Sequence, residues 1–520
     1  MRAHIVGSGL ASLSAAAYVI RNGGLLANNI YVYEASKYLG GAMGMAGEPA
    51  TGYVLPTGRV FERNFRCALE LFSLVPSASD PKRSIKEEIL AFNERYGFYD
   101  KAHIIDRDQN VVRSSHFGLS LRDRLDLIKL AFTPEAMLED RKINEFFTSE
   151  FFRTEFWFLW MALMGCLPQH SAMEMRRFLH RFLHLLPSLS TMTEIYRTRY
   201  DQNEAIIQPI TKWLRNQGVN FLTATFVDSI EFKASVDHIT ANSLEYVRDG
   251  KPTTVEIEPD DLVLVTNGSQ TADLSLGSMT APATFRFDGR SWALWKRLAR
   301  GRREFGNPDT FFGETHLSDT AWLTFTVTTT DPTFFDLVTK FTGSEPGRGG
   351  HMTFKDSNWV ITFTIFPQPH FVEQPPSVKV WWGYALYPRR VGNFIKKPML
   401  ECSGAEILNE ILWHLDFAKD AERIIGSATC IPCLLPYAGS VWLPRKRMDR
   451  PSVTPTGSTN LGFIGQFAEI PLETIFTMEY SVRSAREVVS TLLKLDAKLP
   501  PVYQGQHDPR ALYNALNALA

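Results

Sequence analysis

The order of apolar and polar positions at the start of the chain predicts a strand, a tight turn and a helix. Residues 3–6 form a short apolar run, two glycines fall within residues 7–12, and small or apolar side chains dominate residues 13–20. A second apolar run covers residues 30–33 and ends at Glu34. A strand, a glycine turn, a helix and a second strand in this order are typical of the first half of a βαβ unit.

The hydrophobic pattern changes character further along the chain. Residues 80–190 are amphipathic and rich in charge, which predicts helices, and residues 205–265 predict a helix followed by strands. Between residues 310 and 390, apolar runs at 322–327 and 359–366 are rich in β-branched and aromatic side chains, as strands are, and prolines separate them. We therefore predict an α/β protein with a Rossmann-type cofactor domain, discontinuous in sequence, an inserted mixed α/β substrate domain and a helical C-terminal segment.

These changes also predict domain boundaries. The cofactor domain is expected in three parts, which a helical region and a substrate-binding domain separate. In chain order the expected ranges are 1–110 (first part of the cofactor domain), 111–190 (helical substrate or lid region), 191–285 (second part), 286–425 (substrate-binding domain), 426–485 (third part) and 486–520 (C-terminal helical segment).

Composition and charge narrow the class of protein. The 520 residues include 55 basic and 56 acidic side chains, so no overall positive field exists to attract nucleic acid. The 36 phenylalanines and 11 tryptophans fit either a large aromatic core or a wide apolar cavity. The apolar run at 156–168 is shorter than the roughly 20 residues that span a bilayer.

The cysteines and histidines indicate the compartment and the absence of a metal. Five scattered cysteines and no secretory leader favour a reducing compartment. Cys430 and Cys433 form a lone pair without a nearby histidine at ligand spacing, so a zinc or redox role is not expected. His180 and His184 are four residues apart but lack the glutamate of a zinc protease, so packing is their expected role. We predict a soluble, cytoplasmic protein without a bound metal.

The glycine turn has the chemistry of a phosphate-binding site. Gly7 permits a sharp turn, and Gly9 lets the backbone approach a pyrophosphate. The helix that begins near Leu10 and Ala11 presents N–H groups and a positive dipole end to the anion. Glu34 follows Gly9 by about 25 residues, where an acid accepts hydrogen bonds from ribose hydroxyls. A glycine-rich turn with a surface glutamate is the alternative.

Later segments favour FAD over NAD as the dinucleotide. Gly40 and Gly41 follow the second strand, where the phosphates or ring of a flavin come close to the backbone, and Arg59 adds a cation. A strand at 261–265 leads to a turn, and a late glycine-bearing turn at 457–467 is of the kind that contacts the ribityl chain in many FAD enzymes. The expected FAD contacts are Gly7, Gly9, Leu10, Ala11, Glu34, Gly40, Gly41, Arg59, Asn267, Gly465 and Gln466.

Ordered, uncommon strings occur along nearly the whole chain, at residues 5–13, 169–172, 176–178, 200–204, 353–359, 368–371, 382–384, 397–399, 449–460 and 465–467. Together they resemble the oleate hydratase (myosin-cross-reactive antigen) family. The resemblance implies an FAD-dependent hydro-lyase that adds water to a cis double bond of a long-chain unsaturated fatty acid, typically giving a 10-hydroxy acid without net redox change. Such chemistry needs an acid that protonates the alkene and a base that orients water, held in a dry pocket.

Two positions of the family bear on catalysis. The resemblance places the family's proposed proton donor at Tyr200; a core or flavin-packing tyrosine is the alternative. The family's water-activating glutamate corresponds to Val60, and a valine cannot accept a proton from water. A second family carboxylate is missing from the string 41–47, which contains Met43 and Met45. We expect Val60, Met43 and Met45 to face the substrate, with water held by backbone and flavin groups or with a different reaction in the site.

The expected partners are a fatty acid and a membrane surface. The resemblance places the polar anchor for the fatty acid carboxylate in residues 436–440, with Tyr437 and Ser440 as candidates. The basic, amphipathic residues 176–183 allow contact with a membrane surface, although an ordinary amphipathic helix is the favoured alternative. Dimeric relatives carry an extension before the glycine motif, which here begins almost at Met1, so we expect a monomer.

The residues leave three functions open. A fatty acid hydratase is the leading hypothesis, because of the family strings and Tyr200. A flavin-dependent double-bond isomerase or oxidoreductase on a related lipid is the second, because Val60 and Gly44 stand where the family has carboxylates. A non-catalytic lipid- or flavin-binding protein is the third. Analysis of the products together with the flavin absorbance separates these three functions.

Overall fold

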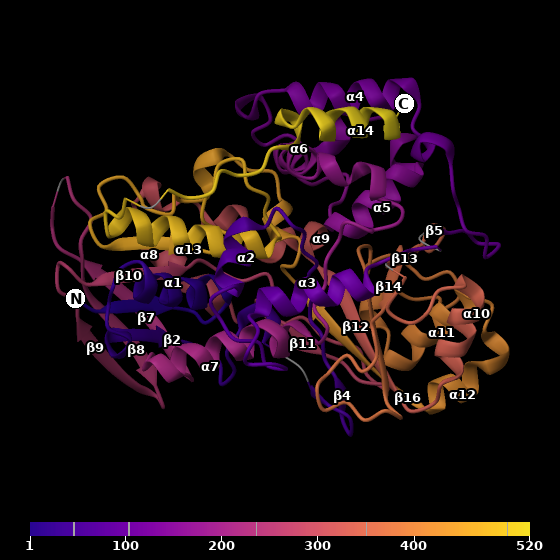
Figure 1. Cartoon of the computed structure of the whole chain (residues 1–520), viewed down its shortest axis with the longest axis horizontal. Coiled ribbons are helices and arrows are strands. Elements are labelled where there is room, and N and C mark those ends of the chain that lie inside the picture. Colours follow the sequence, from indigo (N-terminus) through magenta and orange to yellow (C-terminus); the bar gives the residue numbers. More distant parts are fainter. Residues whose placement is uncertain (45–46, 102–103, 236, 350, 497, 520) are drawn as a thin grey trace.

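Five parallel strands form the sheet that contains the predicted βαβ strands (Figure 1). The computed structural model describes all residues except 45–46, 102–103, 236, 350, 497 and 520. The two strands predicted at the start of the chain are neighbours, with Ile5 beside Val32. In spatial order the sheet contains β17 (Leu461–Ile464), β10 (Leu262–Thr266), β1 (Ala3–Val6), β2 (Ile30–Tyr33) and β6 (Asn220–Leu222).

Two helices from opposite ends of the chain cover this sheet. α1 (Leu10–Arg21) follows the glycine turn and packs against α13 (Met478–Leu492). Residues 15–17 of α1 are alanines and are fully buried, and such small side chains let a helix approach its sheet closely. Since β17 and α13 join strands from the first residues of the chain, the sheet is assembled from distant segments, as predicted.

A seven-stranded sheet contains both predicted apolar runs, now as β12 and β14. Neighbouring strands are antiparallel except for β13 and β5. All eight residues of β12 are buried, and it shares a core with α10 (Thr333–Thr342) and α11 (Gly404–His414). The order is β11 (Ser275–Leu276), β16 (Ala428–Leu435), β12 (Trp322–Thr329), β15 (Lys379–Ala385), β14 (Ile361–Ile365), β13 (His351–Phe354) and β5 (Ile104–Ile105). β16 pairs with this sheet although it lies in the range expected for the cofactor domain.

Smaller elements complete the α/β part. An antiparallel meander of β7 (Thr225–Phe232), β8 (Ala241–Arg248) and β9 (Lys251–Glu256) contacts the parallel sheet through β2. The remaining elements are the strand pair β3 (Gly47–Glu48) and β4 (Gly52–Tyr53) and the helices α2 (Arg66–Phe72), α7 (Gln208–Gln217), α8 (Arg290–Leu298), α9 (Leu317–Thr320) and α12 (Ala421–Gly426).

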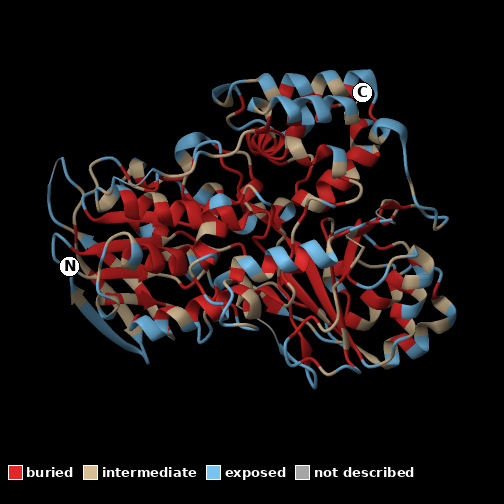
Figure 2. Cartoon of the chain, in the orientation of Figure 1, coloured by how far each residue is buried: buried red, intermediate tan, exposed pale blue. Residues whose placement is uncertain are grey.

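Residues 80–190 are largely helical, as predicted, and the C-terminal helix lies beside the later part of this region (Figure 1). α14 (Pro509–Leu519) packs against residues 183–188. Figure 2 shows exposed outer faces on α4 and α14 and a buried α6. The helices of this region are α3 (Ile85–Tyr96), α4 (Leu121–Phe132), α5 (Glu155–Met164) and α6 (Ala172–Arg181).

The burial of α6 bears on the two interpretations of residues 176–183. Arg177 forms ion pairs with Glu135 at 2.9 Å and with Glu469 at 2.7 Å, and the Arg181 side chain is fully buried. Arg177 and Arg181, held in internal ion pairs, are not available to a membrane surface, which favours the ordinary amphipathic helix for residues 176–183. No helix in the described part of the chain is long and apolar enough to cross a membrane.

Candidate active site

A pocket of about 430 Å³ opens where the strands of the parallel sheet end at the glycine turn. Gly7 has a φ of +97°, which favours glycine, and Gly9 precedes α1 without a capping side chain. The start of this helix therefore presents backbone N–H groups and the positive end of its dipole to a bound anion. Apart from Asn267, the expected FAD contacts all line the pocket: Gly7, Gly9, Leu10, Ala11, Glu34, Gly40, Gly41, Arg59, Gly465 and Gln466.

The two glycine segments pack backbone against backbone. Gly40 has a φ of +113° and its N–H donates to the Ser8 carbonyl oxygen at 3.1 Å. A Cβ atom on Gly41 would lie 3.1 Å from the Gly9 Cα, so any larger residue would displace the first turn. The pocket wall is thus bare backbone at the place where a diphosphate would lie. This geometry fits the dinucleotide predicted from the sequence.

Other expected cofactor contacts differ in their surroundings. Glu34 lies at the end of β2 and accepts hydrogen bonds from the Ser8 hydroxyl at 2.6 Å and the Ser36 N–H at 2.8 Å. The Gln466 side chain lines the pocket but donates to the Thr477 carbonyl oxygen at 2.9 Å, so it braces the segment before α13. Asn267 is buried and does not line the pocket, although both of its chain neighbours do.

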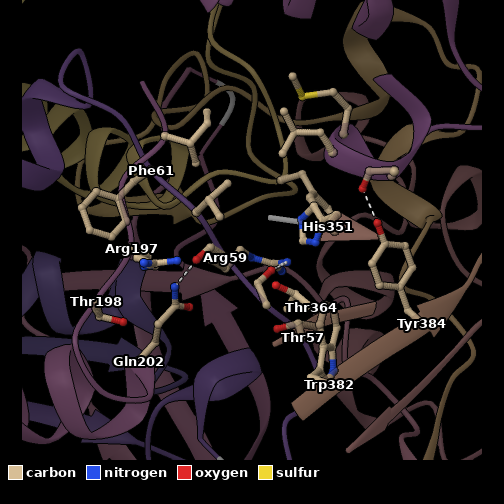
Figure 3. Close-up of a pocket in the computed structure, with 18 of the residues that line it drawn as sticks. Thr57, Arg59, Phe61, Arg197, Thr198, Gln202, His351, Thr364, Trp382 and Tyr384 are labelled. Carbon is tan, nitrogen blue, oxygen red and sulfur yellow. Dashed lines mark hydrogen bonds between the residues drawn. The ribbon is translucent and has the colours of Figure 1, made fainter. Parts of the chain in front are cut away.

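A second cavity, with mostly apolar walls, adjoins the first (Figure 3). Arg59 and Thr477 line both, so they mark where the two spaces meet. The Trp382 N–H donates to the Leu55 carbonyl oxygen at 2.8 Å and the Tyr384 hydroxyl donates to that of Ala162, so both rings present carbon atoms to the cavity. An alkyl chain in this space would bury apolar surface, at roughly 25 cal/mol per Å². The apolar wall includes Val60, Phe98, Phe178, Trp322, Trp382 and Phe476.

Two arginines introduce positive charge into this apolar space. Arg59 lies over the Phe476 ring at 4.2 Å and donates to the Gln270 side chain at 3.1 Å, and burial lowers its pKa to about 10. Arg197 lies over the Phe98 ring at 3.9 Å, and its Nη2 donates to the Tyr96 carbonyl oxygen at 2.7 Å.

Arg197 has more buried nitrogens without a hydrogen-bond partner among the described residues than Arg59 has. Its Nε and Nη1 atoms are buried and have no hydrogen-bond partner among the described residues, and burial lowers its pKa to about 9. A buried cation without an anion is costly, because little water can solvate it. An anionic ligand in the cavity would remove this cost.

Two carboxyl groups line the same cavity, and they differ in their partners. Glu62 is bound by Arg181 at 3.0 Å and by His184 at 3.3 Å; burial would raise its pKa, but these partners hold it below its ordinary value. Asp201 forms no ion pair with any described residue, and burial raises its pKa to about 7. His370 also lines the cavity, and burial lowers its pKa to about 3, so its imidazole is neutral.

The remaining candidates lie elsewhere. Tyr200 is half-buried beneath the Arg199 guanidinium, 4.8 Å from its ring centre, and lines neither cavity. Tyr437 packs against Trp292 with ring centres 4.9 Å apart, and the Ser440 hydroxyl donates to the Tyr437 carbonyl oxygen at 2.8 Å. Neither Tyr437 nor Ser440 lines the apolar cavity.

The structure also bears on the roles predicted for Met43, Met45 and His180. Met43 lines the dinucleotide pocket instead of the apolar cavity, and Met45 lies outside the described residues. His180 binds the Ala131 carbonyl oxygen at 2.9 Å, and the described residues contain no cluster of three or more metal-ligating side chains. Sequence reasoning missed Arg197 and Asp201. The signal for Asp201 was its place directly after Tyr200 in the string at 200–204.

The fold and the two adjoining cavities define a Rossmann-type dinucleotide-binding protein. Among solved structures, the chain is similar to cyclohexylamine oxidase from Brevibacterium oxydans IH-35A, at 14% identity and a TM-score of 0.56, covering 95% of this chain and 98% of that one. It is also similar to putrescine oxidase bound to putrescine, at 12% identity and a TM-score of 0.54, covering 95% and 99%. At these identities the likeness shows the fold, and the predicted fold class is confirmed.

Sequence comparison then gives the family. A family model described as the MCRA family matches residues 1–490. The chain is 33% identical over 524 residues to an oleate hydratase of Streptococcus pyogenes serotype M49 (strain NZ131), covering 99% of this chain and 88% of that protein. It is 31% identical over 528 residues to a linoleate hydratase of Lactiplantibacillus plantarum, covering 93% and 92%. The chain belongs to the MCRA family, as the resemblance implied.

Proposed function

We propose that this protein is an FAD-dependent hydratase that adds water to a cis double bond of a long-chain unsaturated fatty acid. The observation that carries the proposal is the junction at Arg59 and Thr477, where an apolar cavity meets a pocket built for a dinucleotide. The names of the two hydratase relatives support the same reaction.

The glycine turns and Glu34 are the residues that would hold FAD. The diphosphate would take the N–H groups at the start of α1, and Glu34 the ribose hydroxyls. Arg59 would place a cation at the junction. When bound, FAD supplies electrostatic shaping of the site without a net redox change.

Arg197 is our candidate for the carboxylate anchor. Two of its buried nitrogens have no hydrogen-bond partner among the described residues, and the residue lines the largely apolar cavity, where a guanidinium and a carboxylate can form a charge-assisted pair. Tyr437 and Ser440, the anchors expected from the sequence, remain alternatives, but they do not line this cavity.

Tyr200 remains the predicted proton donor. It does not line the cavity, whereas Thr198, Asp201 and Gln202 beside it do. Tyr200→Phe removes the phenolic proton and keeps the ring. Loss of hydration in this variant would support a donor role, and retained hydration would leave the tyrosine a packing role.

Labelled water separates the three candidate functions. The FAD-loaded protein is incubated with oleate or linoleate in 18O-labelled water. The masses of the products are measured by mass spectrometry, and the flavin absorbance is recorded during the reaction. A hydratase gives a labelled hydroxy acid with no net change in the flavin absorbance. An unlabelled isomer or a bleached flavin would assign the protein to the isomerase or oxidoreductase class, which Val60 in the cavity wall keeps open. Binding of the fatty acid without formation of any product would indicate the third function, a non-catalytic lipid- or flavin-binding protein.

The proposal also covers the oligomeric state of the protein and its location in the cell. We infer a monomer that works in the cytoplasm. Light scattering of the purified FAD-loaded chain tests the first point, and cell fractionation tests the second.

A further inference from the structure

Asp201 is a buried carboxyl group that the apolar cavity contains without a neutralising cation. The residue is 6% exposed and lines the cavity. Its Oδ2 accepts the Asn203 N–H at 2.8 Å, as a side chain does at the start of a helix. Capping alone does not require a carboxylate, because asparagine or serine caps as well. The negative charge therefore needs another reason.

Two other proton acceptors of the cavity, Glu62 and His370, are already engaged or too weak. Glu62 is tied to Arg181 and His184, and its carboxylate also accepts the Asn64 N–H at 2.7 Å. His370 is stacked on Phe366 with ring centres 3.8 Å apart, and an imidazole with a pKa of about 3 is a poor base at neutral pH. Among the described residues lining the cavity, Asp201 is the remaining carboxyl group.

Hydrogen bonds fix Asp201 near the junction with the dinucleotide pocket. The Gln202 side chain donates to the Arg59 carbonyl oxygen (Figure 3), and Arg59 lines both spaces. The Asp201 N–H donates to the His370 carbonyl oxygen at 2.8 Å. The carboxyl group is thus held between two segments of the cavity wall, next to the segment that carries Val60.

We propose that Asp201 is the general base that takes a proton from the attacking water, a role that rests on the proposed hydratase function. The water oxygen forms a bond to one alkene carbon, and one O–H bond of the water breaks as its proton passes to the Asp201 carboxylate. The other alkene carbon gains a proton from the acid of the site. The proton on Asp201 then returns to that acid through solvent, so alkene and water give an alcohol with no electrons lost or gained.

The charge environment suits a base that works near neutral pH. Burial and the nearby Glu204 raise the pKa of Asp201 and backbone N–H groups lower it, which together bring it to about 7. A base is active when ionised, so turnover should rise with pH through about 7. The other charged or titratable groups of the cavity are Arg59, Glu62, Arg197, His351, His370 and Tyr384, and Arg199 lies close to His370.

Asp201→Asn in the FAD-loaded enzyme tests this role. Asparagine keeps an oxygen for the Asn203 N–H but cannot take a proton from water. We expect kcat to fall by about 100-fold or more, the rise with pH to disappear, and flavin content and KM to stay as in the wild type. Asp106→Asn is the matched control, because Asp106 caps backbone N–H groups in a half-exposed turn outside both cavities.

Each other outcome overturns the proposal. A kcat within about threefold of wild type, with the pH dependence intact, would show that the carboxylate is not the base. Asp201→Ser also keeps an oxygen that can cap the helix. If both Asp201→Ser and Asp201→Asn fail to fold or to bind flavin, the carboxylate is needed for the stability of the fold and not as a base. If the wild type gives no labelled hydroxy acid, the hydratase proposal has failed and the base role fails with it, whereas an active wild type with an active Asp201→Asn variant rejects the base role alone.

Discussion

Arg197→Met removes the cation that we assign to the fatty acid carboxylate. Methionine keeps much of the length of the side chain and its contact with the Phe98 ring, but it cannot bind an anion. The substitution leaves the Tyr96 carbonyl oxygen without its donor, and it also removes a buried charge that lacks an anion. The fold should therefore tolerate the change.

The expected loss follows from the burial of the guanidinium. A hydrogen bond to a charged group contributes about 1.5–3 kcal/mol, which corresponds to roughly 10- to 150-fold in affinity. Because the carboxylate is remote from the double bond, the pair would stabilise the bound substrate and the transition state alike. KM for the free acid should rise by this factor while kcat changes little.

Comparison of a free fatty acid with its methyl ester isolates this interaction. The wild type should prefer the acid, and Arg197→Met should lose that preference because neither ligand can then form the pair. Arg302→Met is the matched control: Arg302 also lies over a phenylalanine ring, that of Phe232 at 4.6 Å, and lines neither cavity. An Arg197→Met enzyme that keeps both the wild-type KM and the acid preference would refute the assignment.

Three further predictions concern the cofactor site and stability. Gly41→Ala should weaken FAD binding roughly 5- to 30-fold, because a side chain at its φ of +57° costs about 1–2 kcal/mol and the new Cβ contacts the first glycine turn. Gly24→Ala is the control: Gly24 has a φ of +64° and open space around it, so a titration should show unchanged FAD affinity. Glu174→Gln should lower the free energy of unfolding by about 3–5 kcal/mol, because two buried arginines lose their shared carboxylate; urea unfolding measures this. Glu469 should contribute stability that is lost as pH falls from about 4.5 to about 2, because burial alone would raise its pKa but nearby arginines lower it to about 2. Glu469→Gln should flatten acid unfolding in that window, and an unchanged acid transition would contradict the shift.

The cofactor site was predictable because its signals are local. Gly7, Gly9 and Glu34 fall within one strand–turn–helix–strand sequence, and residues in such a unit keep the same relation whatever surrounds them. The strand at 322–327 was equally readable, since a run of β-branched and aromatic residues identifies a buried strand without knowledge of its neighbours.

The apolar cavity was not predictable in the same way. Asp201 is positioned by the carbonyl oxygen of His370, and Arg197 by the Asn93 side chain, so contacts across more than a hundred residues decide what faces the space. Such contacts leave no periodic pattern in a single sequence. For the same reason, the sequence identified the string that contains Tyr200 but did not show that Asp201, the next residue, lines the cavity.

A crystal structure of the protein with FAD and a bound unsaturated fatty acid tests the central claim most directly. The account predicts the dinucleotide along the glycine turns at the start of α1 and the alkyl chain in the apolar cavity. It also predicts the carboxylate within hydrogen-bonding distance of Arg197 and the double bond close to Asp201. A fatty acid bound outside this cavity, or a flavin placed away from the junction at Arg59, would contradict it.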